Sequence, residues 1–222
     1  GHRVFLDTRL CLGARFSTRF PAIDAFCREA GIDPTADPIP VRPAAHYHMG
    51  GVAVDTEGGS TVSGLWACGE VASTGLHGAN RLASNSLIEA VVASGWVADS
   101  VRNAANSPAV RMFPQQTPIR PDASAVRGIV SSALGVLRNL GGLRQAAAEL
   151  LPLATSDSAS ADPAIVGLMM AVSALGREES RGAHSRTDYP ARAAVVRRTR
   201  LTLDAALDTA RDLDLTPMAR SA

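Results

Sequence analysis

Residues 76–87 combine polar side chains with a transition into an apolar stretch, and this combination is suited to binding a charged ligand. Residues 84–86 are serine, asparagine and serine, which favour the N-cap of a helix, and residues 87–92 predict a buried helix. The first N–H groups of such a helix have no intrahelical acceptor and attract electron-rich ligand atoms. Arg81 adds a planar guanidinium that fits a carboxylate. The simpler alternative is a capped helix with a surface arginine.

Glu70 and a histidine pair are further candidates for a site. Glu70 follows a β-prone run, and a carboxylate at a strand end can accept hydrogen bonds from ribose hydroxyls, although an isolated Gly-Glu is usually a turn. His46 and His48 would face the same way on a strand, an arrangement that two metal ligands can have. No third ligand lies nearby in sequence and the chain has no Cys-x-x-Cys motif, so a metal site is disfavoured.

The first half of the chain predicts mixed helix and strand. Residues 4–6 predict a strand, and a helix at residues 22–30 would place Ile23, Phe26 and Cys27 on one face. Four prolines in residues 34–43 predict an extended connection. We expect a small antiparallel unit and then a long helix. The two strands of this unit and the helix are expected at residues 52–55, 65–68 and 85–105.

The second half, residues 120–222, predicts a small helical bundle. Its helices are expected at residues 126–137, 143–151 and 165–175, and from about Pro190 onward. Gly141 and Gly142 would end the first of them. The last helix would bury Leu203, Ala206, Ala210 and Leu213. The arginines at 192, 197, 198 and 200 and the aspartates at 204, 208 and 212 would share that helix, where a solvated surface is favoured over an anion-binding face.

Composition excludes several classes of protein. The 222 residues are 46% hydrophobic, which supports a folded core, and the net charge of +1 argues against nucleic-acid binding over the whole surface. All 22 basic residues are arginine, so chemistry that needs a lysine, such as a Schiff base or a Walker-A nucleotidase, is excluded. We expect no membrane span and no secretory signal. Three scattered cysteines favour a reducing, cytoplasmic location.

Four strings in the chain resemble motifs of L-aspartate oxidases, in the succinate dehydrogenase/fumarate reductase flavoprotein family. Their order and spacing also match. They occupy residues 43–51 (PAAHYHMGG), 64–72 (GLWACGEVA), 76–87 (LHGANRLASNSL) and 179–190 (ESRGAHSRTDYP). The resemblance covers most of this chain but less than half of a complete family member. It implies an α+β fold: the C-terminal part of an FAD-binding domain, with a small β unit and a long helix, followed by an all-α helical bundle domain.

The resemblance also assigns roles to five residues. It implies that His46 and Arg81 hold the two carboxylates of a dicarboxylate, and that Glu70 contacts the ribityl or ribose portion of FAD. Ser86 and Leu87 match the helix start whose N–H groups meet flavin N1 and O2, where negative charge develops on reduction. No Gly-x-Gly-x-x-Gly is present, and no residue here matches the catalytic arginine of the family, which lies further upstream.

The implied reaction is the FAD-dependent oxidation of L-aspartate to iminoaspartate, with oxygen or fumarate as electron acceptor. The product would feed quinolinate and NAD biosynthesis, with quinolinate synthase as a possible partner, and the fragment alone is expected to be inactive. One alternative is a fumarate reductase or succinate dehydrogenase flavoprotein, which usually carries Gly-Gly where this chain has Ala83 and Ser84. Another is a noncatalytic helical fragment.

The expected domain organisation has four parts. These are the end of a capping domain and the return to the flavin domain (1–45), the C-terminal part of the FAD-binding domain (46–106), a proline-rich linker (107–119) and a helical bundle domain (120–222).

Overall fold

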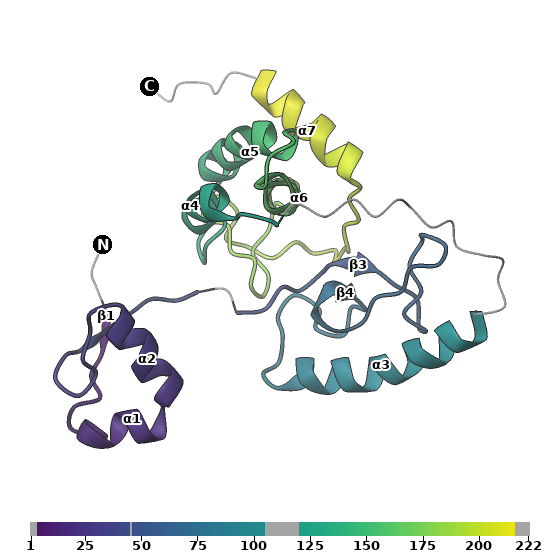
Figure 1. Ribbon diagram of the computed structural model, residues 1–222. Helices are drawn as coiled ribbons and strands as arrows, with labels where there is room; N and C mark the ends of the chain where they lie inside the picture. Colours follow the sequence, from purple (N-terminus) through teal and green to yellow (C-terminus); the bar gives the residue numbers. More distant parts are fainter. Residues whose placement is uncertain (1–3, 45, 105–119, 216–222) are drawn as a thin grey trace. The chain divides into compact units, whose positions relative to one another are not determined.

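The computed structural model describes residues 4–44, 46–104 and 120–215 (Figure 1). The chain divides into two compact units, Gly1–Ala44 and Ala45–Ala222, which are considered separately below. The expected linker at 107–119 lies outside the described residues, so its role as a boundary stays a prediction. Within the described ranges, no helix combines the length and the apolar character needed to cross a bilayer.

The first unit is a two-stranded sheet with short helices. Strand β1 (Val4–Leu6) pairs antiparallel with β2 (Ile39–Val41), and η1 (Gly13–Arg15), α1 (Phe16–Arg19) and α2 (Pro21–Glu29) lie between them in sequence. The predicted strand at 4–6 and the predicted helix at 22–30 are confirmed. The expected connection at 34–43 contains β2. The predicted apolar face of α2 is only partly right, because Cys27 is buried whereas Phe26 is exposed.

The second unit opens with a small sheet that differs from the predicted one. Strand β3 (Val52–Ala53) pairs in parallel with β4 (Ala72–Ser73), which directly follows the 3-10 turn η2 (Gly69–Val71). The predicted strand at 65–68 is wrong, since only Trp66 of that run forms a bridge, antiparallel to Gly59. Glycine at position 51 permits the close approach of the two backbones, because a Cβ there would lie 2.2 Å from the carbonyl oxygen of Val71.

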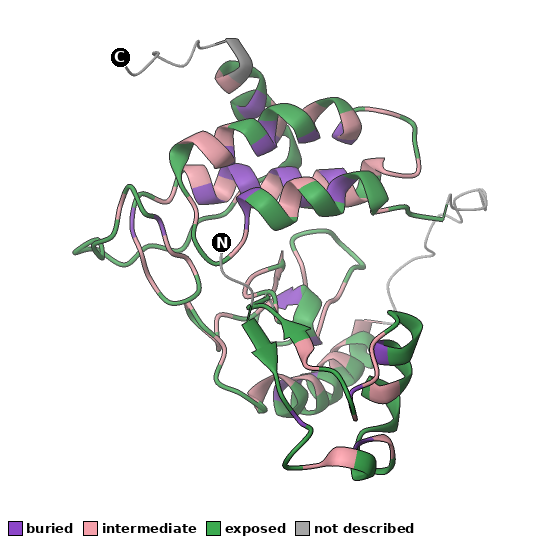
Figure 2. Cartoon of the chain, turned by 90° about the vertical axis from the view of Figure 1, so that its left-hand side faces the viewer, coloured by how far each residue is buried: buried purple, intermediate pink, exposed green. Residues whose placement is uncertain are grey.

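The long helix α3 (Asn85–Ala104) is present as predicted, but it is not buried. Leu87 is 76% exposed and Val91 is 74% exposed, and only Glu89 and Ala93 of this helix are buried. Figure 2 shows the burial class of the residues along the chain. The helix packs against η2, where Gly69 lies next to Ala90. The helix predicted from the apolar run at 87–92 is therefore correct. Its predicted burial is wrong, because no described residue covers the outer face of the helix.

The helical part of the second unit is a bundle, as predicted. It contains α4 (Ser124–Ala133), α5 (Leu140–Ala154), α6 (Ala161–Leu175) and α7 (Leu203–Leu215). Figure 1 shows α5 and α6 packed side by side, with α7 against them. Gly167 lets α6 pack closely against α5 and α4, since a Cβ at this position would lie 3.2 Å from Leu150 and 3.3 Å from Val130. Ala206 and Ala210 turn into this core.

Two predicted helix limits are wrong. Gly141 does not end a helix but lies inside α5, because the Asn139 side chain accepts from the Gly142 N–H and starts that helix. The last helix begins at Leu203 rather than near Pro190, since the Thr202 hydroxyl accepts from the Ala205 N–H. Residues 190–202 have no helix or strand, so the arginines at 192–200 do not share a helix with the aspartates of α7.

Candidate functional site

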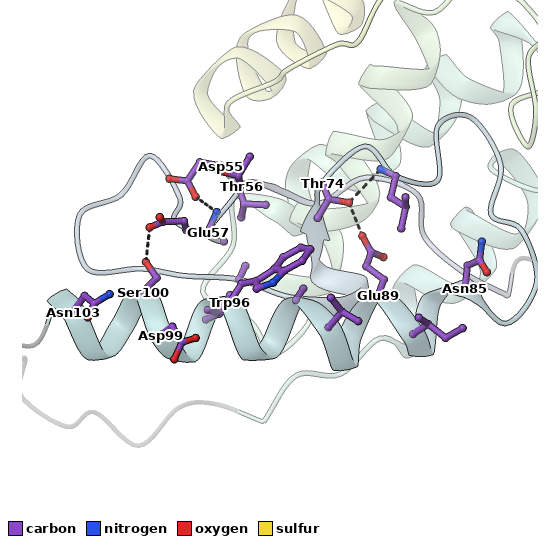
Figure 3. Close-up of a pocket in the computed structure, with 18 residues that line it drawn as sticks. Asp55, Thr56, Glu57, Thr74, Asn85, Glu89, Trp96, Asp99, Ser100 and Asn103 are labelled. Carbon is purple, nitrogen blue, oxygen red and sulfur yellow. Dashed lines mark hydrogen bonds between the residues drawn. The ribbon is translucent and has the colours of Figure 1, made fainter.

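A buried carboxylate on α3 organises the polar groups of residues 74–89. Glu89 is 8% exposed and accepts two hydrogen bonds. The Thr74 hydroxyl donates to Oε1 over 2.5 Å, and His77 Nε2 lies 2.6 Å from Oε2. Figure 3 shows the Thr74 contact on the inner side of α3. An ionised carboxylate only accepts hydrogen bonds, so Nε2 of His77 would be the donor to such a group. The loop after β4 is thereby fixed to the first turns of α3.

Tyr47 links this buried group to Arg81. The rings of Tyr47 and His77 make an edge-to-face contact, with 5.1 Å between their centroids. The Arg81 guanidinium carbon lies 5.1 Å from the centroid of Tyr47, within the range of a cation–π contact. Burial raises the pKa of the Tyr47 hydroxyl, and the negative charges of Glu89 and Glu70 raise it further. Tyr47 is therefore a neutral phenol between a buried acid and a cation.

Arg81 is also attached to the start of α3. Its Nη1 donates to the Ser86 hydroxyl over 3.2 Å, so this serine positions the arginine. Ser84, two residues earlier, has a φ of 69°, a left-handed conformation that is uncommon outside glycine. Leu87 lies in the first helical turn, whose N–H groups lack intrahelical acceptors.

The other two predicted residues lie on less enclosed surface. Glu70 is exposed, and its Oε1 accepts from the backbone N–H of His48 over 3.0 Å. This contact gives His48 a local structural role through its backbone. His46 is exposed and makes no hydrogen bond with the described residues, but it directly precedes Tyr47 and hence the Arg81 contact.

Of the five predicted residues, the fold brings Arg81 and Ser86 into direct contact, and Leu87 follows Ser86 in the first turn of α3. Sequence reasoning missed Thr74, His77 and Glu89 as parts of the site. One signal was available: Glu89 is the only charged residue in the apolar run 87–93, and such a charge is normally buried only when paired. Its partners could not be read from the sequence, because they lie 12 and 15 residues away.

A groove of about 1020 Å³ follows the inner side of α3 (Figure 3). Thr74 and Glu89 line one end, Glu57 and Ser100 line the other, and Trp96 lies between them. None of the five predicted site residues lines this groove. The groove therefore shares Thr74 and Glu89 with the site, whereas Arg81 lies outside its lining.

The described residues fit part of an FAD site. The first turn of α3 presents N–H groups of the kind that stabilise negative charge, and Leu87 and Ser86 lie in that turn. The exposed Glu70 carboxylate makes only one hydrogen bond, through Oε1, to the described residues, so its second oxygen can accept from a hydroxyl. Arg81 uses one nitrogen for Ser86 and retains N–H groups for a carboxylate.

Comparisons with known proteins identify the relatives of this chain. Residues 1–87 match the family model described as an FAD binding domain, and residues 160–218 match that of the fumarate reductase flavoprotein C-terminus. L-aspartate oxidase of Mesorhizobium japonicum is 60% identical over 95% of this chain and 41% of its own length. The FrdA chain of E. coli quinol fumarate reductase has a similar fold, with a TM-score of 0.68 and 28% identity over 88% of this chain and 40% of its own.

The chain thus spans about two fifths of several curated relatives. It covers much more of another: L-aspartate oxidase of Rhodospirillum rubrum is 46% identical over 86% of this chain and 73% of its own length. The expected family and the expected cofactor are confirmed by these matches. The chain belongs to the L-aspartate oxidase family of FAD-dependent flavoprotein oxidoreductases.

Proposed function

We propose that the protein containing this chain oxidises L-aspartate to iminoaspartate, and that residues 46–87 form one side of its substrate and flavin site. The observation that carries this proposal is the fixed position of Arg81, between the Tyr47 ring and the Ser86 hydroxyl at the start of α3. An arginine held in this way at a helix start is suited to orient a carboxylate. The family relationship supplies the substrate class.

The residues of this chain would divide the work as follows. Arg81 and His46 bind the two carboxylates of the substrate and so place its α-carbon at the flavin. Glu70 accepts hydrogen bonds from hydroxyls of the cofactor. The N–H groups near Ser86 and Leu87 stabilise negative charge at the edge of the flavin ring. When bound, FAD accepts the hydride that leaves the substrate.

The acceptor, the pathway and the domain organisation are also proposals. Oxygen or fumarate would reoxidise the flavin, and iminoaspartate would pass to quinolinate synthesis and so to NAD. Residues 1–45 would end a capping domain, 46–106 would complete the FAD-binding domain, 107–119 would link the parts and 120–222 would form the helical domain. The match of residues 160–218 to the flavoprotein C-terminal family supports the last assignment.

Fumarate reduction or succinate oxidation is the second candidate, favoured by the similarity to FrdA. Ser84 bears on the choice, because its left-handed backbone is the kind of position where glycine is expected. Succinate dehydrogenase and fumarate reductase flavoproteins usually carry glycine at this place, whereas this chain carries serine. Comparing turnover of L-aspartate with that of succinate in one preparation distinguishes the two candidates.

The test of the proposed function is Arg81→Ala in the full-length, FAD-bound protein. Losing a charge-assisted contact to a carboxylate removes roughly 1.5–3 kcal/mol, so kcat/KM for L-aspartate should fall about 10- to 100-fold. Flavin content should stay unchanged. The control is Arg102→Ala, since Arg102 is an exposed arginine near the end of α3, paired with Asp99. Unchanged kcat/KM in Arg81→Ala would contradict the proposal.

A further inference from the structure

Glu89 occupies a place on α3 where an apolar residue would pack well. It is buried with Ala93 on the inner side of the helix, although the residues around it in sequence are apolar. Burying a carboxylate is unfavourable unless hydrogen bonds and an opposite charge compensate it. Both oxygens are engaged here, one by Thr74 and one by His77. We therefore expect Glu89 to do more than fill space in the core.

The contacts lead from Glu89 to Arg81 by two routes. On the first, Glu89 fixes the His77 ring, the His77 ring meets the Tyr47 ring, and Arg81 lies over Tyr47. On the second, Ser86 receives the Arg81 hydrogen bond one helical turn before Glu89. Residues three apart lie on the same side of a helix, so the carboxylate and the serine anchor the arginine from the same turn.

We propose that Glu89 and His77 are positioning residues that hold Arg81 in its substrate-binding orientation through the Tyr47 ring. This inference rests on the proposed function, since it assigns Arg81 to the substrate carboxylate. An arginine side chain loses much rotamer freedom when it binds a ligand, and a preset orientation reduces that loss. A fixed aromatic ring beneath the guanidinium and a fixed hydroxyl beside it provide such an orientation.

A purely structural role for Glu89 is the competing explanation. The same hydrogen bonds attach the loop at residues 74–77 to α3, so their loss could simply destabilise the fold. The two explanations differ in what they predict for substrate affinity. A structural role lowers flavin content and thermal stability without acting through Arg81. A positioning role raises KM for the dicarboxylate, and only while Arg81 is present.

The experiment is a double-mutant cycle on the full-length, FAD-bound protein with Glu89→Gln, Arg81→Ala and the combined variant. Glu89→Gln keeps the shape but weakens the hold on His77. Since cation–π and orientation effects of this kind are worth a modest amount, KM should rise roughly 3- to 10-fold with little change in kcat. In the Arg81→Ala background the same substitution should leave KM within about twofold. Glu57→Gln is the matched control and should leave KM unchanged, since Glu57 lies outside α3 and accepts from Ser100 toward the far end of that helix.

The outcomes separate this inference from the proposed function. No effect of Arg81→Ala alone would remove the proposed function. Suppose that Arg81→Ala lowers kcat/KM as expected. The positioning role alone would then be overturned if Glu89→Gln left KM unchanged, or if it raised KM equally with and without Arg81. If Glu89→Gln does not accumulate with bound flavin, Tyr47→Leu takes its place in the cycle. Coupling between Tyr47→Leu and Arg81→Ala then supports the inference, and additivity refutes it.

Discussion

We expect Arg186 to contribute strongly to the stability of α6, and the substitution Arg186→Met tests this. Its side chain is 0% exposed and forms a two-pronged ion pair with Asp188, at 2.8 and 2.7 Å. Its Nη1 also donates to the last carbonyl groups of α6, at Ala174 and Leu175. Methionine fills similar space but leaves these acceptors unpaired. Breaking a buried pair costs about 3–5 kcal/mol, and because the Asp188 side chain is 29% exposed, the loss should lie toward the lower end of that range.

The matched control is Arg211→Met on α7. Arg211 pairs with Asp208 over 2.9 Å, but the two side chains are 55% and 72% exposed. Exposed pairs of this kind contribute about 0–1 kcal/mol. The comparison therefore holds the residue types constant and changes the burial of the pair and the number of hydrogen bonds that the arginine donates.

Native-state hydrogen exchange of α6 in the full-length protein measures both effects, since local opening free energies can be read from amide protection. Arg186→Met should lower the opening free energy of α6 by several kcal/mol, and Arg211→Met should leave it nearly unchanged. A loss below about 1 kcal/mol in Arg186→Met, or equal losses in the two variants, would refute the reasoning from burial.

Three further results are expected. The Arg186 guanidinium holds the pKa of Asp188 below its ordinary value of 3.8, so the ionised carboxylate stabilises the fold at pH values above 3.8. Amide protection of α6 should therefore fall as the pH drops below 3.8, and Asp188→Asn should flatten this pH dependence. Ser84→Gly should stabilise the protein by about 0.5–1 kcal/mol, as the relief of a left-handed residue exceeds the entropy cost of glycine; a melting temperature that does not rise would contradict this. Residues 1–222 alone should lose FAD on gel filtration and yield no sustained hydrogen peroxide with L-aspartate, because they contain no Gly-x-Gly-x-x-Gly loop to bind the pyrophosphate; retained flavin with turnover would show otherwise.

Several features could be predicted from the sequence because they depend on neighbours along the chain. The apolar spacing of α3, α5 and α6 and the proline at the start of α2 are local signals, and these helices form where they were expected, within a few residues. Helix ends were less predictable. Gly141 and Gly142 resemble a stop signal, yet Asn139 accepts a hydrogen bond from Gly142 and makes the pair part of a helix.

The arrangement of the site required the tertiary structure. The residue types of the motif at 76–87 already indicated a carboxylate-binding arginine at a helix start, and the contact of Arg81 with Ser86 spans only five residues. The strand pairing at Val52 and Ala72 and the burial of Glu89 depend on segments that are not adjacent in sequence. A charge in an apolar helix can face either solvent or the core, and sequence periodicity does not distinguish these. Only the fold, by bringing Thr74 and His77 to its two oxygens, made burial of this carboxylate favourable.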